Sequence, residues 1–100
     1  MKQQTILDKM REYIQDFREQ LAKNDLDSLT ALVANTKTHF KDLMRDLPDD
    51  CTPGRDVEIF IICVDRFGGA CLRHDLDQAA LLLVEMEAIT DSMQAECDVV

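Results

Sequence analysis

The chain has 100 residues, of which 46% are hydrophobic, 31% charged and 5% aromatic. This length suits one domain with a single apolar core, and the apolar fraction argues against a disordered chain. Three glycines, two prolines and few aromatic residues argue against a turn-rich β-sandwich or β-barrel. We therefore expect a single helical domain over residues 1–100.

The net charge of −9 comes entirely from the second half of the chain. Residues 1–47 carry eight acidic and eight basic side chains, whereas residues 48–100 carry twelve acidic side chains and three arginines. Such an acidic field repels the phosphates of nucleic acids and attracts basic surfaces. We expect no direct contact with nucleic acid, and a protein partner with a basic surface.

The chain shows no sign of a secreted or membrane protein. It opens on a charged amphipathic segment without the apolar region of a signal peptide, and its apolar runs are too short to span a membrane. Four cysteines lie 12, 8 and 26 residues apart, without a C-x-x-C pair: Cys51, Cys63, Cys71 and Cys97. We expect free, buried thiols in a cytoplasmic protein, with a disulfide or zinc framework as the alternative.

The first half predicts two amphipathic helices, at about 5–23 and 26–46. The apolar stripe of the first consists of Ile6, Leu7, Met10, Tyr13, Ile14, Phe17 and Leu21. The stripe of the second consists of Leu29, Leu32, Val33, Thr36, Phe40, Leu43, Met44 and Leu47. Asp25 or Asp27 can cap the second helix, and Pro48 begins a loop that ends at Gly54.

Residues 53–73 are rich in β-branched residues, so a buried strand is an alternative to a helix. The polar positions favour the helix, because they share one sector of a helical wheel about 100° wide: Arg55, Glu58, Asp65, Arg66, Gly69 and Arg73. Thr52 as N-cap before Pro53 is a good helix start. We expect a mostly buried helix around which the other three gather, in which Gly68-Gly69 permits either a close approach or a kink.

A fourth helix, at about 76–96 and capped by Asp75 or Asp77, has two apolar faces. One consists of Ala79, Leu82, Leu83, Met86, Ile89 and Met93; the other of Leu81, Val84, Ala88 and Ala95, flanked by Asp77, Glu85, Glu87 and Asp91. The second face is either core or a partner-binding surface. In the latter case the predicted binding residues are Leu81, Val84, Glu85, Glu87, Ala88, Asp91 and, on the third helix, Ile62.

A short internal repeat supports this division of the chain. Asp25-Leu26-Asp27 recurs as Asp75-Leu76-Asp77 at an offset of 50 residues, and each copy opens a helix. Short connections favour antiparallel neighbours, so we predict an all-α antiparallel four-helix array of two helical hairpins. The segment 21–29 resembles the joints of tetratricopeptide-type repeats and, in outline, flagellar export chaperones, but the aromatic and small-residue signatures of those repeats do not follow.

No pattern in the sequence predicts catalysis, a cofactor or a metal. His39 borders an apolar face and His74 lies in a turn, where Cys71 is the one conceivable nucleophile near it. The paired carboxylates fall at helix starts, in loops or on solvated faces, and no calcium-binding or phosphate-binding loop occurs. We expect a non-enzymatic protein.

Three functions fit these features. The first is a small acidic protein that binds and masks a surface of a partner, as an inhibitor, anti-activator, adaptor or export chaperone does. The second is a structural homodimer, although its acidic faces would repel each other. The third is an acidic mimic of nucleic acid that blocks a DNA- or RNA-binding protein, whose binding would collapse with salt.

Overall fold

The computed structural model describes the backbone of residues 2–45 and 53–98, and the side chains of residues 5–42, 45 and 55–96. These residues form four helices and no strand: α1 (Lys2–Lys23), α2 (Leu26–Arg45), α3 (Pro53–Leu72) and α4 (Leu76–Asp98). The all-helical prediction is confirmed. The predictions that concern Leu47, Pro48, Cys51 and Thr52 and the side chains of Leu43, Met44 and Cys97 lie outside the described part of the chain.

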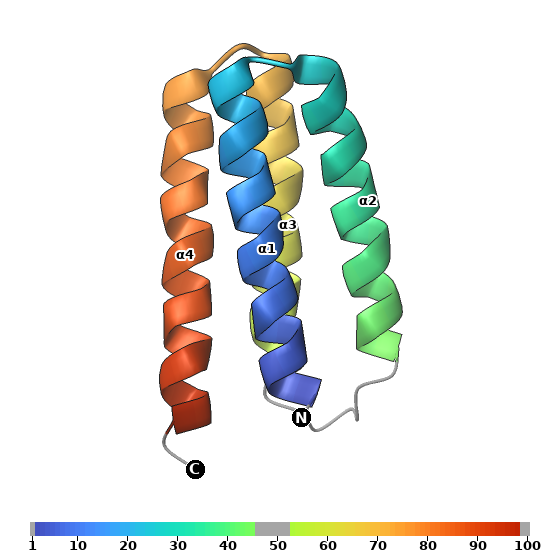
Figure 1. Ribbon diagram of the computed structural model, residues 1–100, viewed down its shortest axis with the longest axis vertical. Helices are drawn as coiled ribbons and strands as arrows, with labels where there is room; N and C mark the ends of the chain where they lie inside the picture. Colours follow the sequence, from blue (N-terminus) through green and yellow to red (C-terminus); the bar gives the residue numbers. More distant parts are fainter. Residues whose placement is uncertain (1, 46–52, 99–100) are drawn as a thin grey trace.

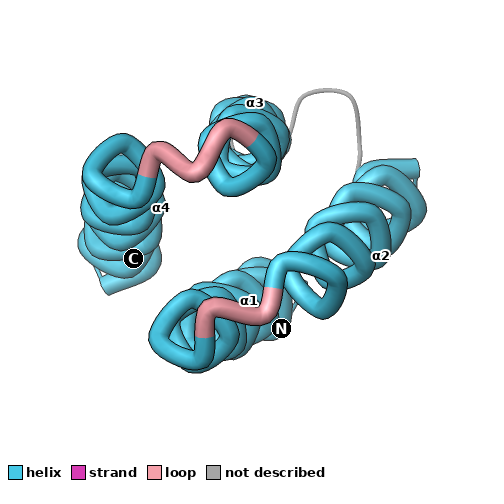
Figure 2. The backbone as a smooth tube through the Cα atoms, turned by 90° about the horizontal axis from the view of Figure 1, so that it is seen from above, coloured by secondary structure: helices cyan, strands magenta, loops and turns pink. Residues whose placement is uncertain are grey.

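The helices form a ring in the order α1, α2, α3, α4, in which each packs against the next and α4 packs against α1 (Figure 2). The turns between α1 and α2 and between α3 and α4 lie at one end of the bundle, and the start of α1 and the end of α4 lie at the other (Figure 1). The helices are therefore arranged as two antiparallel hairpins, which confirms the predicted four-helix array. We call α1–α2 the first hairpin and α3–α4 the second.

The core lies inside this ring and is built around four phenylalanines. The rings of Phe17 and Phe67 lie 5.0 Å apart across the diagonal from α1 to α3, and those of Phe40 and Phe60 lie 5.3 Å apart between α2 and α3. All four are fully buried. Among the residues whose side chains are described, the inward-facing stripes thus form the core, with Tyr13, Leu21, Leu32 and Ile89 partly buried at its edge. Their burial supplies the main stabilisation of the bundle.

The prediction that the other helices gather around 53–73 was wrong. Helix α3 supplies many core residues, but it occupies a corner of the ring between α2 and α4. Its polar sector faces solvent, and Ile59 and Ile62 lie within this exposed sector. The exposed position of Ile62 agrees with its prediction as a contact residue, whereas the exposure of Ile59 at the edge of the same sector was not predicted.

The two turns have the same geometry, 50 residues apart. Asn24 and His74 both adopt a left-handed backbone conformation, with φ of 56° and 59°. Their N–H groups donate to the carbonyl oxygen three residues back (3.0 and 3.1 Å), and the next N–H donates to the one five residues back (3.3 and 2.9 Å). This is the Schellman ending of a helix.

The same aspartate then starts the following helix in each hairpin. A carboxylate oxygen of Asp25 accepts the N–H of Ser28, and one of Asp75 accepts the N–H of Gln78, both at 3.1 Å. Both are N-cap contacts that satisfy an otherwise unpaired helix donor. Asp25 and Asp75, rather than Asp27 and Asp77, are therefore the caps, and the short internal repeat corresponds to a repeated turn.

Gly68 allows α2 and α3 to approach closely. A Cβ atom at this position would lie 3.1 Å from Cγ1 of Val33, which is tighter than ordinary van der Waals contact. Helix α3 continues through both glycines to Leu72. Of the two roles predicted for Gly68-Gly69, the close approach applies to Gly68.

Candidate partner-binding surface

The two hairpins place buried residues at equivalent positions, 50 residues apart. The buried pairs are Leu7/Val57, Met10/Phe60, Ile14/Val64, Phe17/Phe67, Leu29/Ala79, Val33/Leu83, Thr36/Met86 and Phe40/Thr90. Thr36 and Thr90, which replace an apolar residue in one member of their pairs, each donate their hydroxyl to a carbonyl of their own helix (2.6 and 2.7 Å). The hairpins can therefore be compared position by position.

Their outer faces differ. All the large hydrophobic residues that are exposed in the described part of the chain belong to the second hairpin: Ile59, Ile62, Leu72, Leu76, Leu81 and Val84. The equivalent residues of the first hairpin are Lys9, Glu12, Ala22, Leu26, Ala31 and Ala34. Only Leu26 among these is large and apolar, and it is partly buried. The hairpin geometry therefore does not require large apolar side chains at these outer positions.

The predicted second apolar face of the fourth helix points to solvent. Leu81 and Val84 are 60% and 59% exposed, and Ala88 is exposed as well. Ile62 on the neighbouring α3 is 52% exposed. The alternative that Leu81 and Val84 belong to the core was therefore wrong. We call Ile62, Leu81, Val84 and Ala88 the outer apolar patch.

The acidic residues predicted to surround this patch are divided among three places. Glu85 lies towards α3, where its Oε2 accepts the thiol of Cys63 at a long distance of 3.9 Å. Glu87 and Asp91 lie towards α1, where they pair with Arg18 and Arg11. Asp77 is exposed near the start of α4. The sequence placed Glu87 and Asp91 on the rim, but it could not show that α1 supplies their cationic partners.

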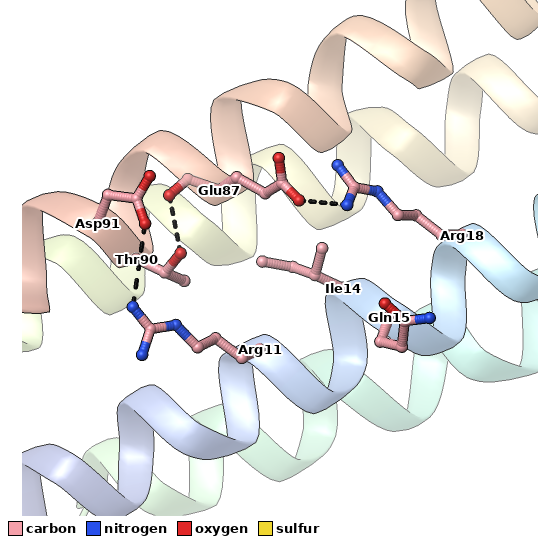
Figure 3. A pocket seen from close by; sticks show the side chains of 7 residues that line it. All are labelled: Arg11, Ile14, Gln15, Arg18, Glu87, Thr90 and Asp91. Carbon is pink, nitrogen blue, oxygen red and sulfur yellow. Dashed lines mark hydrogen bonds and ion pairs between the residues drawn. The ribbon is translucent and has the colours of Figure 1, made fainter.

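A groove of about 370 Å³ runs along this contact between α1 and α4 (Figure 3). The guanidinium of Arg18 pairs with the Glu87 carboxylate, and that of Arg11 lies 3.9 Å from Asp91 and donates to Gln94 at 3.0 Å. Both arginines are thus already engaged by α4. This groove joins the two hairpins, and its charges are occupied within the molecule.

A second groove, of about 580 Å³, lies between α3 and α4 near their turn. It is lined by Asp65, Arg66, Gly69, Arg73, Asp75, Gln78 and Leu82. Unlike the arginines of the first groove, Arg66 and Arg73 form no ion pair with any described residue. Sequence reasoning treated these residues only as a polar stripe. The signal that it missed was two arginines on either side of a glycine in an otherwise acidic hairpin.

The groups considered for catalysis have structural environments. Burial raises the pKa of the thiols of Cys63 and Cys71, which is the opposite of what an activated nucleophile needs. The hydroxyl of Tyr13 lies 2.8 Å from Nδ1 of His39, in a partly buried contact between α1 and α2. His74 is exposed in its turn and contacts Cys71 through the backbone.

Cys63 and Cys71 are free and buried, as predicted. They lie eight residues apart on one helix, a rise of about 12 Å, which is too far for a disulfide. Within the described residues, no three histidine, cysteine, aspartate or glutamate side chains gather in a way that could hold a metal ion.

Comparison of the chain with protein-family models, with curated proteins and with solved structures found no match. Among the helices of the described ranges, none has the length and apolarity needed to cross a membrane.

Proposed function

We propose that this protein is a non-enzymatic binding protein, and that the outer apolar patch of its second hairpin docks a basic amphipathic helix of a partner protein. A cytoplasmic regulator, inhibitor or chaperone that masks a surface of its target would work in this way. The observation that carries the proposal is the exposure of Leu81 and Val84 at positions where the first hairpin has alanines.

An exposed apolar patch contributes little to the packing of the bundle, and it lowers the solubility of the protein unless a partner covers it. Transferring such side chains from water to an interface is favourable by about 25 cal/mol for each Å² of apolar surface buried. Exposed apolar residues that share one face of a helix, as Leu81, Val84 and Ala88 do on α4, are typical of interaction sites. The patch therefore supplies a hydrophobic contact, which the fold itself does not use.

The charge distribution favours a basic partner. Residues 48–100 carry the whole net charge of −9, and Asp77 and Glu85 lie on the same helix as Leu81, Val84 and Ala88 of the patch. A basic helix would be attracted to this hairpin, whereas another acidic copy of the chain would be repelled. A helix with one apolar and one basic face satisfies both requirements.

The proposal can be tested with a synthetic amphipathic peptide of about 18 residues, built from leucine and lysine with helical spacing. A peptide with glutamate in place of lysine serves as its charge control. We expect the leucine–lysine peptide to shift the backbone amide NMR signals of Leu81, Val84, Ala88 and Ile62 in the labelled protein. The leucine–glutamate peptide should leave them unchanged.

A matched pair of variants separates the patch from general acidity. Val84→Lys and Ala34→Lys add the same charge at equivalent positions of the two hairpins. We expect Val84→Lys to weaken peptide binding about tenfold, or about 1.4 kcal/mol, and Ala34→Lys to have a much smaller effect. Circular dichroism should show both variants folded. The proposal would be refuted if Val84→Lys and Ala34→Lys weakened peptide binding equally, or if the peptide shifted mainly the amide signals of the first hairpin.

Salt separates this function from mimicry of nucleic acid. Contacts within the apolar patch should persist at moderate salt, because a Debye length of about 8 Å at physiological ionic strength screens mainly the charges. Binding that disappears entirely between low and physiological salt would favour the mimic. A stable dimer detected by light scattering would favour the structural homodimer.

A further inference from the structure

Arg66, Gly69 and Arg73 follow one another along the outer side of α3 and line the groove between α3 and α4. Leu82 is 1% exposed and contributes a buried apolar wall, and Gln78 contributes a side-chain amide near the start of α4. The groove thus combines two guanidinium groups, an amide and an apolar surface. These are groups that recognise an oxyanion carried on an organic molecule.

Packing between helices does not explain Gly69. A Cβ atom at Gly69 would meet only Nη1 of Arg73, at 3.4 Å, which is ordinary contact with the end of a flexible side chain. Glycine within a helix is unfavourable relative to alanine, so this residue weakens α3 with no gain in packing. The equivalent position of the first hairpin is Glu19. The absence of a side chain at Gly69 leaves room for the guanidinium of Arg73 to lie over this position of α3, within the groove that Arg66 also lines.

The acidic residues of the groove are engaged elsewhere. Asp65 accepts a hydrogen bond from Nζ of Lys37 at 2.7 Å, and Asp75 caps α4 through the N–H of Gln78. The two arginines have no such partner among the described residues, although their hairpin has ten acidic side chains and only three arginines. Their guanidinium groups are thus available to an incoming anion.

We propose that this groove is a subsite for the carboxylate of an acidic side chain on the protein that docks on the outer apolar patch. This inference rests on the proposed function and adds a second recognition element to it. Arginine binds carboxylates through two parallel N–H···O bonds, which fixes geometry as well as charge. A basic helix with one acidic residue would thereby dock in a defined register and direction.

The acidic field of the hairpin selects the type of anion. A phosphate carries up to two negative charges and would be repelled more strongly than a carboxylate, which carries one. A carboxylate on a basic partner is brought in by the favourable charge of the remainder of that partner. The partner class is therefore a basic amphipathic helix with a single acidic anchor.

Acetate is the probe for the subsite, with chloride at equal ionic strength as the control. We expect acetate to shift the Nε–Hε NMR signals of Arg66 and Arg73 and the side-chain amide of Gln78 in a saturable way. Chloride should not do so. Arg73→Gln should weaken acetate binding about threefold, as expected for the loss of an exposed charge pair.

Gly69→Glu tests the subsite by filling it from within. The new carboxylate lies between the two arginines and should abolish the acetate shifts, whereas Gly69→Gln, of nearly the same size, should reduce them less. Circular dichroism of both variants checks that α3 is retained. Equal effects of the two variants, or acetate shifts that rise linearly without saturation, would overturn the subsite.

The outcomes separate this inference from the proposed function. If the leucine–lysine peptide binds the patch and acetate shows no saturable shifts, the subsite is refuted and the docking surface stands. If acetate binds and the peptide does not, the groove takes small free carboxylates, and a partner-borne anchor is refuted. Binding of both, with acetate shifts lost in Gly69→Glu, supports the inference.

Discussion

The two hairpins share their interior and differ in their exterior. Positions 50 residues apart are buried together, and both turns use a left-handed residue followed by an aspartate cap. The outer face, by contrast, bears alanine and charged residues on the first hairpin and isoleucine, leucine and valine on the second. Packing constrains the inner positions in the same way in both halves, so the unmatched outer positions are where a binding role can be sought.

The contacts that join the hairpins also reflect this difference. In the ion pairs between them, the first hairpin supplies the cations Arg11, Arg18 and Lys37, and the second supplies the carboxylates. Cations of the first hairpin therefore neutralise part of the negative charge of the second hairpin. Because these pairs are largely exposed, each contributes at most about 1 kcal/mol, and their main effect is on which faces associate.

The largest expected effect comes from the shared interior. Phe17→Ala and Phe67→Ala remove equivalent, fully buried rings that contact each other, and each should lower the free energy of unfolding by about 3–5 kcal/mol. The double variant should lose less than the sum, because each single change already removes the shared contact. Urea unfolding measures all three. A loss of less than about 1 kcal/mol from either single variant would contradict equal roles in the core.

A smaller effect distinguishes the two adjacent glycines. Gly69→Ala should raise the free energy of unfolding by about 0.5–1 kcal/mol, because alanine is the better helix former and the new Cβ meets no rigid neighbour. Gly68→Ala should raise the free energy of unfolding less than Gly69→Ala does, or lower it, because its Cβ atom would lie 3.1 Å from Cγ1 of Val33. Urea unfolding of both variants tests this.

Val33→Ala in the Gly68→Ala background provides the control for that explanation. Relief of the crowding should make Gly68→Ala less harmful in the presence of alanine at position 33 than with valine there. An unchanged effect of Gly68→Ala would show that its close contact with α2 is not what requires glycine.

Much of this fold could be predicted because each helix carries its own signal. Apolar spacing identified all four helices, and the clustering of polar positions identified 53–73 as helical despite its β-branched residues. The caps were narrowed to Asp25 or Asp27 and to Asp75 or Asp77, because capping depends on residues close in the sequence, and the structure decides for Asp25 and Asp75.

The features that the sequence did not reveal depend on which helices become neighbours. A helical wheel places Glu87 and Asp91 beside the outer patch, but it carries no information about Arg18 and Arg11 on α1. The groove at Arg66 and Arg73 requires the approach of α4 for the same reason. The position of α3 at a corner of the ring likewise follows from the packing of all four helices.

The response to acid should be modest and should involve both hairpins. Hydrogen bonds from Ser28 lower the pKa of Asp25, and the Lys37 ammonium lowers the pKa of Asp65. A carboxyl group with a lowered pKa stabilises the fold above its unfolded pKa of about 3.9 and loses that contribution as the pH falls through its folded pKa. The melting temperature should therefore decrease as the pH is lowered past about 4.

Lys37→Gln is the control for the acid response. It should raise the pKa of Asp65 towards the ordinary value and make the acid dependence of the melting temperature shallower. The pKa values can be followed by NMR titration of the side-chain carboxyl carbons. A pKa of Asp65 that does not change in Lys37→Gln would contradict the assigned cause.

The smallest effect is expected on the outer patch, and it provides the most direct test of whether these residues are surplus to the fold. Leu81→Ala/Val84→Ala gives the second hairpin the residues Ala31 and Ala34 of the first. Urea unfolding of this double variant should differ from that of the original chain by less than about 1 kcal/mol. A loss of more than about 3 kcal/mol would show that the two side chains are packed as core residues, and the outer face would no longer be available for a partner.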